Sequence, residues 1–356
     1  HGRAAILVPS DFLYSGFGES IKQYLLSSGM LRHILFFNDK NSLFDDSITT
    51  SCILLLENDT VVKTASFITL DTIADLEPLA KDIQLLDQST IPLTCIIPDT
   101  LLAHQKWSRY FFDSPPHKEL QHLAAFTKLG RVKRGIATGD NRFFTFNREK
   151  ITRTGIPVAY LLPCLSRSSQ ARFPFFTSTD FDDLEESGKS VYLLDADQNP
   201  EHPAVKAYLQ QGEQAGSHQR YLTRFRSPWY HLENRPPAPI LATTFNRQNL
   251  RFVRNEAAVR NLTCFHAIYM LPGLEEKADT LMAYLLTPLA HSLIQRNRRI
   301  YGDGLIKYEP NDLNSALIAD LTLLPETLEK KALSLYADYR HSCLQKQPDE
   351  SIIEKL

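Results

Sequence analysis

Apolar runs of strand length alternate with a helical run over the first hundred residues. The runs AAILVPS (4–10), LRHILFF (31–37) and TTSCILLLEND (49–59) predict strands, and the first is apolar enough to be buried. Between the first two, SIKQYLLSSG (20–29) predicts a short helix that a glycine ends. The runs VVKTASFITL (61–70) and LTCIIP (93–98) predict further strands. We therefore expect residues 1–100 to form the end of an α/β sheet.

Two prolines in DSPPH (113–117) mark a change of pattern. Short strand-like runs then alternate with loops rich in proline, arginine and asparagine, which is typical of an irregular recognition domain. The strand-like runs are FFTFN (143–147), SVYLLD (190–195), PILATTF (239–245), FVRNE (252–256) and FHAIYM (265–270). Towards the end of the chain, apolar residues recur three and four positions apart. They predict helices over residues 278–297, 311–324 and 325–346.

Composition indicates a globular protein without a membrane segment. Hydrophobic residues make up 43% of the 356 residues, yet the apolar runs are far shorter than the roughly 20 residues that a membrane-spanning helix needs. No signal peptide pattern opens the chain, so we expect a cytoplasmic protein. Five cysteines stand far apart, which indicates neither a zinc site nor a disulfide framework. We expect them to be reduced and mostly buried.

Charge is concentrated in two segments, although the net charge is only −2. Residues 128–153 hold eight basic and two acidic residues, and residues 217–260 hold eight arginines, no lysine and two acidic residues. Arginine offers a rigid fork of donors that fits phosphates and the guanine edge. The segments therefore favour nucleic acid as a partner, with a plain solvated surface as the alternative.

Local motifs for chemistry are absent from the sequence. ESGKS (186–190) imitates the end of a phosphate-binding loop, but Asp183 stands where the first glycine is required. SGFGES and YGDGL each contain one G-x-G without the third glycine of a dinucleotide turn. The sequence contains no G-x-S-x-G and no H-E-x-x-H. We expect no metal site and no self-contained active site in this chain.

Six stretches, in order along the chain, resemble the C-terminal part of bacterial N6-adenine DNA methyltransferases of restriction-modification systems. GRAAILVPSDFL resembles the strand after the family's catalytic motif, and LFDDSITTSCILLLEN resembles the later motif whose loop holds the flipped adenine. The other four resemble parts of its DNA target-recognition domain: RVKRGIATGDNRFF, SPWYHLENRPPAPILATTF, RFVRNEAAVRNLTCFHAIY and RNRRIYGDGLIKYEPNDL. The resemblance covers nearly the whole chain, from residue 2 to about residue 320.

Two motifs of that family do not occur in this sequence, the cofactor motif F-x-G-x-G and the catalytic [DN]-P-P-[YF]. DSPPH and NRPPA carry one extra residue before the prolines and no aromatic residue after them. The resemblance implies that an upstream half, on the same product or on a partner chain, binds S-adenosylmethionine and transfers the methyl group. The chain alone is then expected to be inactive.

Adenine methylation requires that the base be rotated out of the duplex and held by stacking. The resemblance places Phe44, in LFDDS, at the position of an aromatic residue that stacks on the flipped adenine. Asp45 and Asp46 directly after it favour a loop at this position. The alternative is a core phenylalanine at the start of the next strand.

Arginine, lysine and asparagine side chains of the recognition domain are expected to meet phosphates and base edges. The DNA-binding candidates are Lys133, Arg134, Asn141, Arg142, Phe143, Arg247, Arg251, Arg254, Asn255, Arg260, Asn261 and Lys307. Asn255 and Asn261 fit an adenine edge, and Asn141, Arg142 and Phe143 are expected at the tip of a turn. Simple solvation of the basic side chains and internal hydrogen bonding of the asparagines remain the alternatives.

The predicted fold is the α/β edge of a methyltransferase (Rossmann-like) sheet, followed by an α+β DNA target-recognition domain and a helical C-terminal region. The expected boundaries are 1–100, 101–274 and 275–356. The predicted function is recognition of double-stranded DNA and capture of the flipped adenine for N6-adenine methylation. The alternative is a non-catalytic DNA-binding specificity subunit of a separate methylase or nuclease. A complete subunit would begin with Met; because the chain begins HGRAAILVPS, we expect a fragment with an exposed sheet edge.

Overall fold

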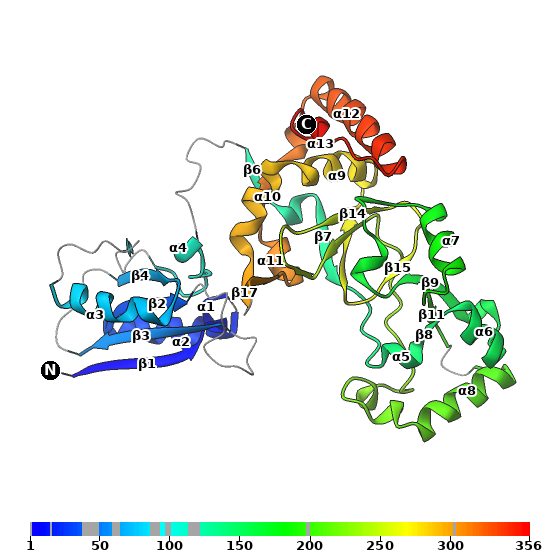
Figure 1. Cartoon of the computed structure of the whole chain (residues 1–356), viewed down its shortest axis with the longest axis horizontal. Helices are drawn as coiled ribbons and strands as arrows, with labels where there is room; N and C mark the ends of the chain where they lie inside the picture. Colours follow the sequence, from blue (N-terminus) through cyan, green and yellow to red (C-terminus); the bar gives the residue numbers. More distant parts are fainter. Residues whose placement is uncertain are drawn as a thin grey trace. The chain divides into compact units, whose positions relative to one another are not determined.

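A computed structural model describes residues 2–14, 16–37, 50–58, 65–85, 93–96, 101–112, 122–196, 200–301 and 304–356. The chain forms two compact units (Figure 1). Unit 1 comprises residues 1–120 and 296–308, and unit 2 comprises residues 121–295 and 309–356. The sequence predicted three parts with boundaries at 100 and 274; the C-terminal helices instead group with the middle of the chain.

Unit 1 is built on a five-stranded mixed sheet in the order β1-β3-β2-β4-β5. Its strands are β1 (Arg3–Pro9), β2 (Leu31–Phe37), β3 (Ser51–Glu57), β4 (Ala65–Leu70) and β5 (Leu93–Ile96). Strands β2 and β4 are parallel, and the other neighbours are antiparallel. All five strands and the helix after β1 lie where the apolar runs predicted them. The predicted strands therefore form one sheet with helices, as expected; its Rossmann-like arrangement stays a prediction.

Alternate residues of β2 face two separate cores. Ile34 and Phe36 pack with Trp107 and with helices α1 (Asp11–Tyr14) and α2 (Glu19–Ser28). Leu35 and Phe37 pack on the other face with Leu79 of α3 (Leu76–Leu85). Gly29 ends α2 in the left-handed conformation, as the glycine stop predicted. Unit 1 also contains α4 (Arg109–Phe112) and a hairpin of β17 (Arg299–Tyr301) and β18 (Leu305–Lys307).

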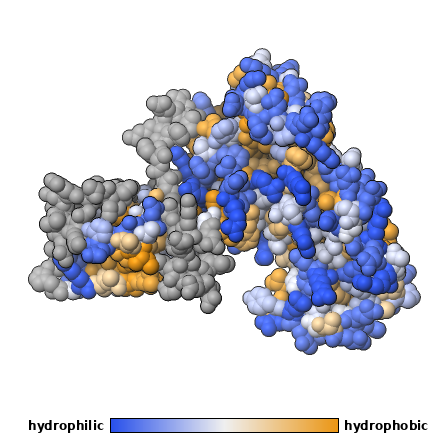
Figure 2. Space-filling view, viewed as in Figure 1, coloured by the Kyte–Doolittle hydropathy of each residue, from blue (hydrophilic) through white to orange (hydrophobic). Residues whose placement is uncertain are grey.

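Strand β1 is exposed, so the prediction that AAILVPS forms a buried strand was wrong. Ile6 and Leu7 are 43% and 50% exposed, although they point to opposite faces. Strand β1 is the outermost strand of its sheet and pairs, among the described residues, with β3 alone. Figure 2 shows hydrophobic side chains on the surface of this part of unit 1. An apolar sequence at a sheet edge has too few neighbours to be covered.

Unit 2 contains a five-stranded sheet in the order β10-β14-β12-β16-β7. Its strands are β7 (Gly130–Arg134), β10 (Phe175–Phe176), β12 (Ile240–Thr243), β14 (Phe252–Asn255) and β16 (Phe265–Met270). A second sheet, in the order β15-β9-β11-β8, contains β8 (Thr145–Phe146), β9 (Leu161–Leu165), β11 (Tyr192–Leu194) and β15 (Arg260–Asn261). Strand β15 pairs with β9 and directly precedes the turn into β16, so the two sheets share one stretch of chain.

Short helices that the sequence pattern did not reveal surround the second sheet (Figure 1). They are α5 (Asn141–Phe144), α6 (Arg148–Thr154), α7 (Ser178–Glu186) and α8 (Pro203–Gln214). Residues of α5 and α8 enter the same core as β9 and β11, with Phe144 and Val205 completely buried. Asn147 and Thr177 cap the N-termini of α6 and α7 through their side chains.

The C-terminal region is mainly helical, with two departures from the prediction. The helix expected over 278–297 divides into α9 (Ala278–Leu286) and α10 (Pro288–Ile294), because Pro288 cannot continue a helix as an interior residue. The helix expected over 311–324 is the short α11 (Pro310–Asn314) followed by strand β19 (Leu317–Ala319), which pairs with β6 (Leu123–Ala125). Helix α12 (Glu326–Leu344) agrees with the prediction and precedes α13 (Glu350–Ile353).

The composition led to two expectations, one about membrane-spanning helices and one about the cysteines, and the described residues bear on both. No helix among the described residues is long and apolar enough to cross a membrane. Cys52, Cys164 and Cys343 are buried free cysteines, and Cys264 is a partly buried one. The expectation of mostly buried cysteines is confirmed for these four.

Exposure of β1 predicts that the chain self-associates through this strand. An uncovered apolar edge is a template for pairing with another chain, and a lysine on the strand opposes such pairing. Leu7→Lys should therefore reduce concentration-dependent light scattering, with the thermal unfolding midpoint nearly unchanged. Leu35→Lys, on buried β2, is the matched control and should lower the midpoint strongly. Equal scattering of wild type and Leu7→Lys would contradict an exposed edge at β1.

Candidate nucleic-acid interface

A turn at residues 137–140 organises one end of unit 2. Gly139 has φ +82°, a backbone conformation that glycine adopts without strain. A side chain there would also lie 3.0 Å from Cβ of Leu222 and 3.2 Å from Cγ2 of Thr223. The turn thus requires glycine at position 139 for two reasons: its backbone is left-handed, and residues 222–223 pack directly against it.

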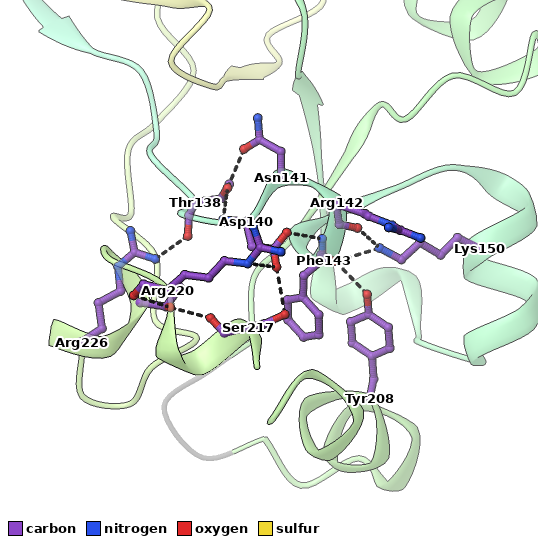
Figure 3. A network of polar contacts seen from close by, with 11 residues as sticks. Thr138, Asp140, Asn141, Arg142, Phe143, Lys150, Tyr208, Ser217, Arg220 and Arg226 are labelled. Atoms are coloured by element: carbon purple, nitrogen blue, oxygen red, sulfur yellow. Dashed lines mark hydrogen bonds and ion pairs between the residues drawn. The ribbon is translucent and has the colours of Figure 1, made fainter. Parts of the chain in front are cut away.

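Asp140 joins this turn to the segment 217–226 (Figure 3). One carboxylate oxygen accepts from the backbone N–H of Phe143 at 3.2 Å and caps helix α5. The other accepts from Oγ of Ser217 and from Nε of Arg220, each at 2.9 Å. Asp140 is only 6% exposed, and these donors replace the water that its charge has lost.

Arg226 fastens the far end of the same segment. Its guanidinium donates to the backbone carbonyl of Thr138 at 2.7 Å and to that of Ala137. Burial lowers the pKa of this guanidinium. Between the two arginines, completely buried Thr223 donates from Oγ1 to the carbonyl of Ser217 at 2.5 Å. Residues 217–226 are therefore held at both ends and in the middle.

Phe143 lies in the core, which corrects the expectation that it stands at an exposed turn tip for DNA. It is 8% exposed and stacks on Tyr208, with ring centroids 4.6 Å apart and planes 18° apart. Trp229 packs against it at 5.2 Å. Only the first two residues of α5, Asn141 and Arg142, are exposed. In a helix of one turn, successive side chains point in different directions, so a run of candidates cannot share one surface.

Lys150 also donates hydrogen bonds inside the protein, although it belongs to the basic segment 128–153. Its Nζ donates to the carbonyls of Arg142, Phe143 and Thr145, at 2.9, 2.7 and 2.7 Å. Burial lowers the pKa of this lysine to about 8. The number of basic residues in segment 128–153 is therefore larger than the number of charged groups that are free to bind a ligand.

Asn255 and Asn261 are each 4% exposed, so the expectation that they contact an adenine edge was wrong for this structure. Asn255 donates to the carbonyls of Ala238 and Val259 and accepts from the N–H of Val259. Asn261 donates to the carbonyl of Phe265 at 2.9 Å. Both side chains hydrogen-bond loop backbone, which is the alternative that the sequence left open.

Three arginine candidates also have internal partners. Arg251 donates to the carbonyls of Ala171 and Ser168, and burial lowers its pKa. Arg254 forms an ion pair with Asp279 at 2.7 Å, and Nε of Arg260 donates to the carbonyl of Arg235. These arginines join strands to loops and helices. A contact with DNA would require them to leave those partners.

The remaining candidates are exposed or only partly buried. Lys133 and Arg134 are exposed on β7, the edge strand of its sheet, and Nζ of Lys133 lies 5.7 Å from the ring of Tyr269. Asn141, Arg142 and Arg247 are exposed in unit 2, and Lys307 is half-buried in unit 1. Phe44 lies outside the described residues. The DNA contacts of these residues stay predictions.

An open groove of about 1160 Å³ in unit 2 brings the candidate Arg142 together with basic residues that the sequence analysis did not single out. It runs past α5, the loop at 166–173 and α7. Its basic lining residues are Arg142, Lys150, Arg167, Arg172, Lys189 and Lys346, and its acidic ones are Asp180 and Asp183. Oδ2 of Asp180 accepts from the backbone N–H and from Oγ1 of Thr177 at the N-terminus of α7. Because Arg167, Arg172, Lys189 and Lys346 lie outside the two basic segments of the sequence, charge clustering did not indicate this groove.

Five of the basic groove residues are exposed and have no ion pair among the described residues: Arg142, Arg167, Arg172, Lys189 and Lys346. No group of histidine, cysteine, aspartate and glutamate in the described part of the chain is arranged to hold a metal ion. The exposed basic side chains of the groove can attract and orient an anionic ligand.

Comparison of the sequence with known proteins matches it to Type II methyltransferases. The family model of the C-terminal domain of Type II methyltransferase M.Eco57I matches residues 104–352. The chain is 39% identical over 363 residues to Type II methyltransferase M.AccI of Acinetobacter calcoaceticus, covering 100% of this chain and 66% of that protein. It is 23% identical over 325 residues to Type II methyltransferase M.XamI of Xanthomonas campestris pv. amaranthicola, covering 89% of this chain and 56% of that protein. The chain thus spans about three fifths of these relatives.

Among solved structures, one of the Type IIL restriction-modification enzyme MmeI in complex with DNA has a similar fold. The TM-score is 0.53 and the identity 12%, and the match covers 99% of this chain and 43% of that chain. At this identity the similarity concerns the fold alone.

Replacing Gly139 tests the turn. Gly139→Ala should lower the free energy of unfolding by about 2 kcal/mol, because the positive φ and the contact with residues 222–223 both oppose a side chain. Gly188→Ala is the matched control, because Gly188 has φ +71° but nothing within 4 Å of its added Cβ. Urea unfolding of both variants separates the two costs. Equal losses would mean that the contact with residues 222–223 contributes nothing.

Proposed function

The chain belongs to the family of the C-terminal domain of Type II methyltransferase M.Eco57I, and from this premise we propose that it recognises double-stranded DNA for a restriction-modification methyltransferase. The observation that carries the proposal is the groove of unit 2, with exposed cations that have no ion pair among the described residues. Duplex DNA supplies the complementary feature, a regular row of phosphates.

The basic residues of unit 2 fall into two groups, those with internal partners and those exposed in the groove. Arginines such as Arg251 and Arg254 are tied to backbone carbonyls or carboxylates, whereas Arg142, Arg172 and Lys189 extend from the surface of one groove. Cations without internal partners bind phosphate at a lower cost, because no ion pair must break first. Contacts of this kind position a protein on DNA but carry no sequence information. Asn141, exposed beside Arg142, accepts from Oγ1 of Thr138 through Oδ1, and its amide nitrogen can donate to a base edge.

The finer part of the proposal is the chemistry. We infer that the methylated group is the N6 amine of adenine and that the base is flipped out of the duplex before it reacts. Phe44 is proposed to stack on that base. S-adenosylmethionine is proposed as the methyl donor, bound mainly by residues that this chain does not contain. The sequence resemblance supports these assignments. The relatives' names support methyl transfer in general.

The proposal predicts salt-dependent affinity for any duplex, with Arg142 among the contacts. Each phosphate contact adds roughly 0.9 to the slope of log K against log salt. Arg142→Gln should therefore weaken binding severalfold for all sequences and reduce the slope by about one. Fluorescence anisotropy at several salt concentrations measures both quantities.

Arg153→Gln is the matched control for this experiment. Arg153 has a side chain that is 69% exposed, lies on α6 and does not line the groove. Its replacement should change affinity and slope little. If the wild type bound no duplex at low salt, the proposed function would fail. If Arg142→Gln and Arg153→Gln behaved alike, the groove would not be the contact surface.

A further inference from the structure

Two aromatic side chains, Tyr221 and Phe225, are unusually exposed. Each is 72% exposed, more than any other large apolar side chain that the structure describes. They lie in the segment between α8 and Pro228, together with Arg224. We call Tyr221, Arg224 and Phe225 the aromatic tip. Exposed rings gain little from folding, so the tip is better explained by binding than by stability.

The three side chains of the tip are packed on one another. The rings of Tyr221 and Phe225 meet edge to face, with centroids 5.8 Å apart and planes 83° apart. The guanidinium of Arg224 lies 5.3 Å from the first ring and 4.6 Å from the second. The tip therefore presents flat apolar rings and a positive charge in one place.

The backbone beneath the tip is held rigidly. Arg220 on one side is paired with buried Asp140, and Arg226 on the other side donates to the carbonyls of residues 137 and 138 (Figure 3). Thr223, in the centre, is completely buried. The rings are thus exposed on a fixed support, which reduces the entropy lost when they bind a ligand.

Charge around the tip favours a polyanion as its ligand. Residues 214–232 contain three arginines and no aspartate or glutamate. The nearby carboxylate of Asp140 is already paired with Arg220. Helix α5, which Asp140 caps, also carries Arg142 of the basic groove, so the tip and the groove share a support. A ligand that combines phosphates with flat apolar faces is a nucleic acid.

We propose that the aromatic tip enters duplex DNA at an opened base step, where the face of one of its two perpendicular rings stacks on an unpaired base, the other ring meets the edge of that base and Arg224 meets the neighbouring phosphate. In an intact duplex the faces of the bases are covered by their neighbours, so aromatic rings can stack only where a base is unpaired or a step is opened. Such openings arise when a methyltransferase extrudes its target base. The proposal rests on the proposed function and adds the residues that sense the opening.

The test uses the full chain and two DNA probes, a paired duplex and the same duplex with one unpaired 2-aminopurine. Wild type should bind the second probe about tenfold more tightly and quench its fluorescence, because each stacked base contributes at this scale. The double variant Tyr221→Ala, Phe225→Ala should lose both the preference and the quenching. Its affinity for the paired duplex should stay within about twofold of wild type, because the groove cations remain.

Two controls keep the outcomes distinct. Val158→Ala changes another exposed apolar residue, 69% exposed, and should behave as wild type. The variant Tyr221→Leu, Phe225→Leu keeps apolar bulk without aromatic faces and should also lose quenching; both double variants should keep the circular dichroism of the wild type. A double alanine variant that kept the preference and the quenching would overturn the proposal and leave a protein partner as the tip's ligand. Failure of wild type to bind either probe would instead overturn the proposed function.

Discussion

The buried carboxylate of Asp140 is the interaction on which the candidate interface depends. A charge that is almost fully removed from water is tolerated only if donors surround it. Here the donors come from three places: the backbone of α5, Ser217 and Arg220. One side chain therefore fixes where α5 begins and where the segment 217–226 lies. Removing any donor would leave part of the charge uncompensated, so the turn, the helix and the segment behave as one element.

The two proposed binding surfaces follow from this arrangement. Because α5 starts at Asp140, Arg142 reaches the groove while Phe143 enters the core against Tyr208. Arg220, Thr223 and Arg226 are engaged inside the protein, and Tyr221 and Phe225 between them are exposed. A groove that attracts phosphates and a tip that offers aromatic faces are thereby carried on one support. Phosphate attraction and base stacking are the two physical requirements of the proposed function.

Much of the fold could be predicted from the sequence, because strong local patterns determine it. The strands of unit 1 follow from apolar runs, and α2 ends at Gly29. Burial was harder to predict, since β1 is as apolar as a core strand but lies at an edge. Short helices such as α5 and α7 have too few turns to show a period. Strand β19 lies in a helical pattern because its pairing with β6 is set by contacts distant in sequence.

The site was predicted less well, for a physical reason. Arginine and asparagine side chains can donate hydrogen bonds to DNA or to the protein's own backbone. Their presence in the sequence does not show which of these acceptors they meet. Asn255 and Arg251 satisfy carbonyls inside the chain. Conversely, Arg172, Lys189 and Lys346 are scattered in the sequence and meet only in the folded groove.

The central claim is that this chain recognises DNA, and selection from a pool of random-sequence duplexes at moderate salt tests it most directly. Sequencing of the retained DNA should show one short site that contains adenine. Retention without enrichment, or no retention, would contradict the claim that this chain carries the recognition.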